Sequence, residues 1–99
     1  MIIIREVYLV VAENLSKAED VLKKDETINR GSITTKSAAS LDIKENGYFI
    51  ILDCNEKALK KAEELLQDIA VKYKYKEKVL SIVDEQEASA IEGFGNILG

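Results

Sequence analysis

Cys54 carries the side chain in this sequence that is most readily made a nucleophile. It follows Asp53 at the end of an apolar run and stands just before a stretch with helical spacing. A nearby helix N-terminus can lower the pKa of a thiol and make the thiolate reactive. The chain has 1 Cys and no His, so both a second thiol and an imidazole base are lacking. We therefore expect a packed, inert thiol, and the sequence predicts no catalytic residue.

An acidic group near the C-terminus, formed by Asp84, Glu85 and Glu87, suggests a cation site. Its spacing matches neither a calcium-binding loop nor a paired-glutamate motif, so a solvated acidic face is expected. The glycines are scattered and none belongs to a phosphate-binding loop. They are Gly31, Gly47, Gly93, Gly95 and Gly99. The sequence therefore predicts no metal, cofactor or nucleotide site.

A basic and aromatic run is the best candidate for contact with nucleic acid. It consists of Lys72, Tyr73, Lys74, Tyr75, Lys76 and Lys78. Lysines neutralise phosphates, and a tyrosine ring can stack on a base, so the run is a candidate RNA-binding segment. The alternative is the solvated, cationic end of a helix.

The composition is that of one small globular domain. The chain has 99 residues, of which 46% are hydrophobic and 32% charged. No apolar run reaches the roughly 20 residues that a membrane-spanning helix needs. With one Cys and no secretory pattern at the start, we expect a cytoplasmic location. The net charge of -4 falls on residues 79–99, which hold four acidic and no basic residues, so nonspecific binding of nucleic acid is not expected.

The first part of the chain predicts a strand followed by a short helix. The β-branched run within residues 1–12 favours a strand. Its stretch from Val7 to Val11 is apolar on both faces, which indicates either burial on both sides or pairing at an interface. Asn14 or Ser16 would cap the helix, because Ser16 and Glu19 have the spacing of a capping box. The helix is expected to end near residue 24.

The middle of the chain predicts two strands and an amphipathic helix. Apolar and polar residues alternate from Ile33 to Ile43, which favours a long strand with one buried face. Asn46-Gly47 is the preferred pair for a type I′ turn, and Tyr48 to Leu52 returns as a second strand. Asn55 is a good N-cap for the helix that follows. Its apolar stripe is Ala58, Leu59, Ala62, Leu65, Leu66, Ile69, Ala70 and Tyr73.

These elements predict an α+β fold with a three-stranded antiparallel sheet and helices on one face, in the order β-α-β-β-α-α. Residues 1–78 would form the core domain, and residues 79–99 an acidic helix and tail packed on the core or on a partner. A last helix is expected over residues 77–91. No Gly or Pro separates it from the preceding helix, so one long helix and two helices both remain open. Such a sheet keeps free edges, which invite pairing with another chain.

Taken in order along residues 7–70, these features resemble the small Pcc-type subunit of the archaeal KEOPS tRNA-modifying complex. The matching features are the apolar strand Val7 to Val11, a short helix with Ala18 and Leu22, Lys24-Asp25-Glu26, a long strand, Asn46-Gly47, the strand Tyr48 to Leu52, and the polar junction Asp53 to Lys57 before Ala58-Leu59-Lys60. Lys60 and Ala62-Glu63 depart from the Arg and the Asn-Ser pair usual in the family. The segment after Lys78 is also extra, which suggests a divergent paralogue.

The resemblance implies a non-catalytic subunit with a βαββα fold that dimerises through its sheet. The dimer would be a homodimer, or a heterodimer with a related small subunit. Its helices would dock on the catalytic subunit that makes threonylcarbamoyladenosine on tRNA, and tRNA would be met through the complex, with no membrane involved. The expected contact residues are Val7, Leu9, Val11, Lys17, Lys24, Lys57, Lys60 and Lys61. The alternatives are an RNA-binding module using Lys72 to Lys78, and an enzyme or small-molecule sensor of the ferredoxin-like kind.

Overall fold

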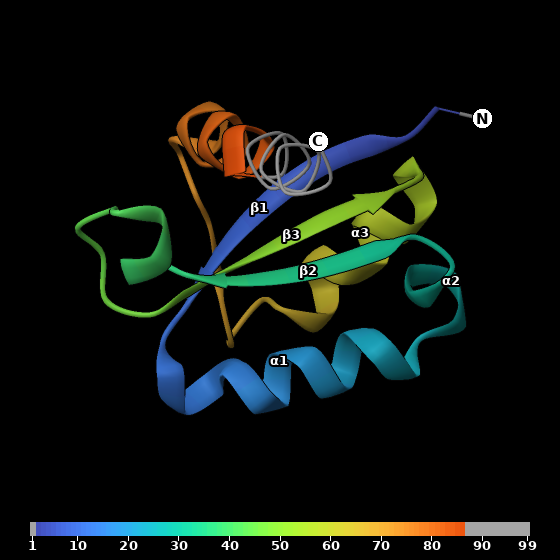
Figure 1. Ribbon diagram of the computed structural model, residues 1–99. Helices are drawn as coiled ribbons and strands as arrows, with labels where there is room; N and C mark the ends of the chain where they lie inside the picture. Colours follow the sequence, from blue (N-terminus) through green and yellow to red (C-terminus); the bar gives the residue numbers. More distant parts are fainter. Residues whose placement is uncertain (1, 87–99) are drawn as a thin grey trace, which may run out of the picture.

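A four-stranded antiparallel sheet forms the centre of the computed structural model, which describes residues 2–86 (Figure 1). The strands are β1 (Ile4–Val10), β2 (Ser32–Ser37), β3 (Tyr48–Cys54) and β4 (Val71–Lys72), in the spatial order β2-β3-β1-β4. The helices are α1 (Ala12–Lys24), α2 (Glu26–Asn29) and α3 (Glu56–Leu65), with a 3-10 turn η1 (Ala39–Leu41). Residues 76–86 are also helical. The predicted α+β class and antiparallel sheet are confirmed.

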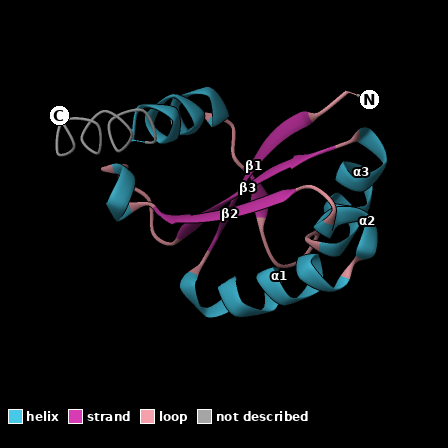
Figure 2. Ribbon diagram, turned by 45° about the vertical axis from the view of Figure 1, so that its right-hand side comes forward, coloured by secondary structure: helices cyan, strands magenta, loops and turns pink. Residues whose placement is uncertain are grey.

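Helices cover both faces of this sheet. Helices α1, α2 and α3 pack on one face, and η1 and the helical segment 76–86 lie on the other (Figures 1 and 2). The prediction of three strands with all helices on one face is wrong on both counts. The reason is β4, which pairs with β1 at the edge of the sheet and brings the chain to the opposite face.

Two cores share β1 and β3, because alternate residues of a strand point to opposite faces. Tyr8, Ile50 and Leu52 face the core under α1 and α3. Val7 and Phe49 face the second core, where Val79 and Val83 of segment 76–86 cover them. This arrangement explains why the central strands are apolar on both sides, as predicted. Residues 79–86 therefore belong to the packed domain.

The start of α1 differs from its prediction. The helix begins at Ala12, after Val11, whose side chain makes no capping bond. Asn14 lies inside the helix, and its side-chain nitrogen donates to the carbonyl oxygen of Ile69 at 3.4 Å. The predicted caps at Asn14 and Ser16 are therefore wrong, whereas the end at Lys24 is confirmed.

Strand β2 is shorter than its alternating pattern predicts. It ends at Ser37, where the backbone nitrogen of Ser40 donates to the Ser37 hydroxyl at 3.1 Å and the Ser40 hydroxyl donates to the Ser37 carbonyl at 2.7 Å. These local bonds turn the chain into η1. Leu41 and Ile43 are buried as the alternation predicts, but they reach the second core from the turn and not from a strand.

The turn before β3 also differs. Gly47 has a φ of 127°, whereas Asn46 has no positive φ, so the predicted type I′ turn is wrong. The N-cap at Asn55 is confirmed, since its side-chain oxygen accepts from the backbone nitrogen of Ala58 at 2.8 Å. Tyr73 does not belong to the α3 stripe, because it faces the second core.

Strand β4 separates two helices, which answers the open question about residues 55–91. Helix α3 ends at Leu65, and segment 76–86 covers the described part of the helix expected over 77–91. The remaining residues of that prediction, and the glycine-bounded tail, lie outside the described residues. The order βαββαβ with this strand arrangement is that of the ferredoxin-like split βαβ unit. A fold of this kind supports many functions and identifies none.

Candidate partner interface

The outer edge of β2 is open. Ala38 donates to the carbonyl of Gly47 at 3.0 Å, in the same register that pairs Ser37 with Tyr48. Because successive residues of an antiparallel strand turn their backbone groups to opposite sides, Ile33 and Thr35 direct theirs away from β3. No hydrogen bond from residues 2–86 reaches those outward groups. Within the described residues, β2 therefore offers a free strand edge (Figure 1).

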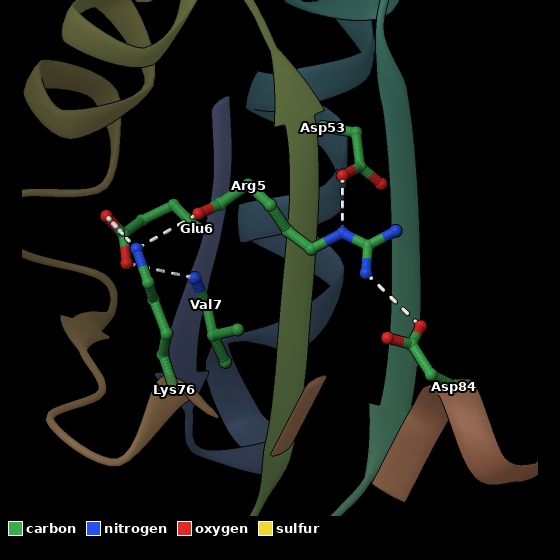
Figure 3. A network of polar contacts seen from close by, with 6 residues as sticks. All are labelled: Arg5, Glu6, Val7, Asp53, Lys76 and Asp84. Carbon is green, nitrogen blue, oxygen red and sulfur yellow. Dashed lines mark hydrogen bonds and ion pairs between the residues drawn. The ribbon is translucent and has the colours of Figure 1, made fainter. Parts of the chain in front are cut away.

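Along the opposite edge, on β1 beyond β4, three of the four outward backbone groups of Arg5 and Val7 are already bonded within the described residues. The backbone nitrogen of Tyr73 donates to the carbonyl of Val7 at 2.9 Å. The backbone nitrogen of Val7 donates to the carboxylate of its neighbour Glu6 at 3.3 Å, and Nζ of Lys76 donates to the carbonyl of Arg5 at 3.2 Å (Figure 3). We call Glu6 and Lys76 the edge cap.

The Glu6 carboxylate is held between two lysines. Its side chain is only 10% exposed, and its Oε2 lies 3.7 Å from Nζ of Lys72 and 3.6 Å from Nζ of Lys76. Lys72 also donates to Glu63 at 2.9 Å, and this hydrogen bond is the main reason why the pKa of Lys72 is raised. The burial of Glu6 is thus matched by paired positive charges, as a buried carboxylate requires.

Arg5 links segment 76–86 to the sheet through ion pairs with Asp53 and Asp84. Its Nε donates to Asp53 at 2.7 Å and its terminal nitrogen to Asp84 at 3.2 Å (Figure 3). The hydrogen bond to Asp53 raises the pKa of the Arg5 guanidinium. Because Arg5 is 42% exposed, each pair contributes on the order of 1 kcal/mol at most.

The predicted apolar contact residues lie in different environments. Val7 is fully buried in the second core and does not reach the surface of this chain. Leu9 is half-buried and Val11 is 46% exposed. These two residues and Val71 line a shallow depression of about 270 Å³ beside β4. Only Leu9 and Val11 are therefore placed to meet another molecule.

The predicted lysine contacts are all exposed and lie on the helices α1 and α3. They are Lys17, Lys24, Lys57, Lys60 and Lys61. Lys24 and Lys60 are paired along their own helices with Asp20 and Glu56. The three lysines of α3 line one groove beside α2, so the structure brings this part of the predicted set together.

The basic run 72–78 is largely occupied by contacts within the chain. Lys72 and Lys76 are paired with acidic side chains, and Tyr73 is buried with its hydroxyl donating to Glu45 at 3.0 Å. Lys74, Tyr75 and Lys78 remain exposed. The Lys74 ammonium lies 5.0 Å from the centre of the Tyr75 ring. The run spans β4, a turn and the first turn of segment 76–86, so only its last residues, Lys76 and Lys78, lie at an end of a helix.

Cys54 is packed, as predicted. Its side chain is 3% exposed, at the end of β3 and next to the α3 N-cap. Burial raises the pKa of the thiol, and the charge of Asp53 raises it further. The position before a helix therefore does not produce a thiolate.

Tyr8 carries the one buried side-chain polar atom without a hydrogen-bond partner among residues 2–86. We expect Tyr8→Phe to raise the free energy of unfolding by about 1 kcal/mol at neutral pH, because an unpaired buried hydroxyl is costly. Burial, with smaller effects from Glu63 and Glu6, raises the pKa of this hydroxyl. Above about pH 10, the unfolded state would lose this proton before the folded state, so stability falls as pH rises.

Urea titrations of the parent and Tyr8→Phe at neutral and alkaline pH test this prediction. The difference in the free energy of unfolding between Tyr8→Phe and the parent should grow above about pH 10. Only the parent has the Tyr8 hydroxyl, whose ionisation favours the unfolded chain. Tyr75→Phe, with an exposed ring, is the matched control and should change little at neutral pH. A loss of stability in Tyr8→Phe would show that the hydroxyl has a stabilising partner.

The edge cap was missed by sequence reasoning. Its one signal is that charged Arg5 and Glu6 interrupt a β-branched run, and charges in a strand are a common way to protect a sheet edge. The side chain that completes the cap, Lys76, lies 71 residues from Arg5 along the chain. Only the folded arrangement brings them together.

Comparisons with protein-family models, curated proteins and solved structures give no match. Within residues 2–86, no group of three or more His, Cys, Asp and Glu side chains is arranged to hold a metal ion. No helix in that part of the chain is both long enough and apolar enough to cross a membrane. The open edge of β2 is thus the feature on which a functional argument can be built.

Proposed function

We propose that this protein is a non-catalytic interaction subunit that dimerises through the edge of its sheet. The observation that carries the proposal is the free outer edge of β2, where Ile33 and Thr35 direct backbone donors and acceptors outward. Addition of a strand to such an edge forms main-chain hydrogen bonds, and it is a common mode of protein association. The second copy could be identical or a related small subunit.

The lysine-bearing faces of the helices are the proposed docking surface for a larger partner. Lys57 and Lys61 on α3 are exposed and have no ion-pair partner among residues 2–86. Such lysines attract an acidic surface and speed encounter with it. The resemblance, and not the fold, supplies the identity of the partner: the catalytic subunit of a KEOPS-like complex in tRNA threonylcarbamoyladenosine modification. The setting would be the cytoplasm of an archaeon.

The alternative, a small RNA-binding module using Lys72 to Lys78, has less support. Lys72 and Lys76 already neutralise Glu6 and Glu63, and the ring of Tyr73 is buried. Counterion release on RNA depends on free positive charges, which leaves Lys74 and Lys78 as the available groups.

Thr35→Pro tests the strand-edge dimer. The Thr35 nitrogen points away from β3, so proline removes no bond of the ladder and is tolerated at a strand edge. It does remove a donor that an added strand needs. We expect the parent to sediment as a dimer at micromolar concentration and Thr35→Pro as a folded monomer. The control, Thr35→Val, keeps the backbone donor and should remain dimeric.

A parent protein that is monomeric in the same experiment would overturn the proposed dimer. The docking surface is tested separately with Lys57→Glu and Lys61→Glu combined, by measuring binding to the purified catalytic subunit. This variant should remain dimeric but lose at least about tenfold in affinity, because it places negative charges opposite an acidic surface. Unchanged affinity would show that α3 is not the docking face.

A further inference from the structure

We infer that self-assembly of this chain stops at two copies, because β2 presents an open edge while the edge cap of Glu6 and Lys76 closes the edge along β1. This inference rests on the proposed strand-edge dimer and specifies its geometry and its limit. The occupant of the β2 edge is a second copy of the chain, in one defined register.

The register follows from the direction of the backbone groups. Two copies related by a twofold axis perpendicular to the sheet would pair β2 with β2 in antiparallel fashion and keep each face of the sheet continuous. Opposed residues must then lie on the same face, so both are odd or both even in number. The outward groups of Thr35 are at the centre of the available edge. Thr35 of one copy would therefore face Thr35 of the other.

This register is self-complementary. Ile33 of one copy would lie opposite Ser37 of the other, and Thr34 opposite Lys36. Lys36 is the one charged residue in β2. In this register it does not lie opposite Lys36 of the other copy. A register centred on Lys36 would place two like charges directly opposite, which destabilises a strand pair. It would also leave Ile33 opposite Ala39, beyond the end of the strand, so fewer outward groups would be paired.

Between Arg5 and Val7, the β1 edge has one outward group without a hydrogen bond from residues 2–86, the Arg5 nitrogen, so it cannot accept a strand as the β2 edge does. The outward nitrogen of Val7 is bonded to Glu6, its oxygen to Tyr73, and the oxygen of Arg5 to Lys76. An added strand would have to displace Glu6 and Lys76 from these positions (Figure 3), and it would separate a carboxylate that is 10% exposed from Lys76, one of its two lysine partners. Weakening the pairing of a buried carboxylate is unfavourable. At two residues, β4 is too short to offer an edge itself.

One open edge and two open edges lead to different assemblies. With one open edge, two copies consume both available edges and growth ends. With two, every added copy exposes a new edge, and the assembly extends without limit. The edge cap therefore determines whether this sheet forms a closed dimer or an open array.

The test is the double variant Glu6→Ala with Lys76→Met, studied by sedimentation velocity at increasing protein concentration. The variant leaves no unpaired charge, because Lys72 keeps its bond to Glu63 at 2.9 Å. We expect species larger than a dimer that grow with concentration. Adding Thr35→Pro should return the assembly to a dimer, now joined along β1. Lys74→Met, which removes an exposed lysine near the same segment, is the control and should remain dimeric.

A double variant that stays dimeric at every concentration would overturn the inference. The proposed function fails by a different result, namely a monomeric parent. In that case the double variant should become a dimer through β1, which would support the edge cap by itself. Far-UV circular dichroism checks that each variant is folded. Should the double variant unfold, the single variant Lys76→Met is compared with the parent. We then expect a smaller amount of species larger than a dimer. A complete absence of such species would overturn the inference.

Discussion

Phe49→Ala is expected to lower the free energy of unfolding by about 3–5 kcal/mol. Phe49 is fully buried at the centre of the second core, and its ring meets that of Tyr73 edge-on at 4.8 Å between centroids. Alanine would leave a cavity between β3 and segment 76–86, because the strands that surround it cannot collapse freely. Urea denaturation monitored by far-UV circular dichroism measures the change.

Tyr75→Ala is the control for this substitution. It also removes an aromatic ring, but that ring is 54% exposed, so the expected change is within about 0.5 kcal/mol. Equal losses in the two variants would contradict the assignment of a second core on this face. A large difference would support a stabilising second core on this face, to which Val79 and Val83 of segment 76–86 contribute.

Gly47→Ala is expected to destabilise the protein by about 2–4 kcal/mol, from backbone strain and overpacking. The φ of Gly47 is 127°, which side-chain-bearing residues rarely adopt. A Cβ at this position would also lie 2.3 Å from the carbonyl oxygen of Val10. The backbone of β1 would have to move away from the turn. Thermal and urea unfolding of the variant both report the loss.

Asn46→Ala is the matched control for the turn. Asn46 has no positive φ, so alanine should be tolerated to within about 0.5 kcal/mol. A type I′ turn, which the sequence predicts, would need a positive φ at both residues and would penalise both substitutions. Comparable losses in the two variants would therefore contradict the observed turn.

The sequence predicts most of the elements of this fold but not where they lie. The stripe on α3 and the cap at Asn55 are local signals. The stripe is confirmed except at Tyr73, and the cap is confirmed down to the capping bond. Strand β4 has two residues, too few to show any periodicity. Its absence from the prediction placed the last helix on the wrong face. Strand β2 ends where Ser37 and Ser40 form hydrogen bonds with each other. The alternation of apolar and polar residues continues to Ile43 and therefore predicts a longer strand.

For the candidate site too, features that depend on neighbouring residues were predictable, and those that depend on residues far apart in the sequence were not. Free edges were expected from the small number of strands, but not which edge remains open. That answer depends on Glu6 and Lys76, which meet only because β4 reverses the chain beside β1. The resemblance implied that Val7 lies at an interface, whereas the two apolar faces of its strand left burial on both sides equally open. The second face is buried within the same chain instead, by Leu41 before β3 and by Val79 and Val83, which follow all four strands in the sequence.

The position of that covering segment has a consequence for truncated chains. Val79 and Val83 follow every strand in the sequence, so a chain that ends before them would leave Val7, Phe49 and Ile51 without part of their cover. Exposed apolar surface of this kind makes incompletely folded chains adhere to one another. A chain truncated before residue 79 should accordingly bind a holding chaperone, whereas the full chain should not.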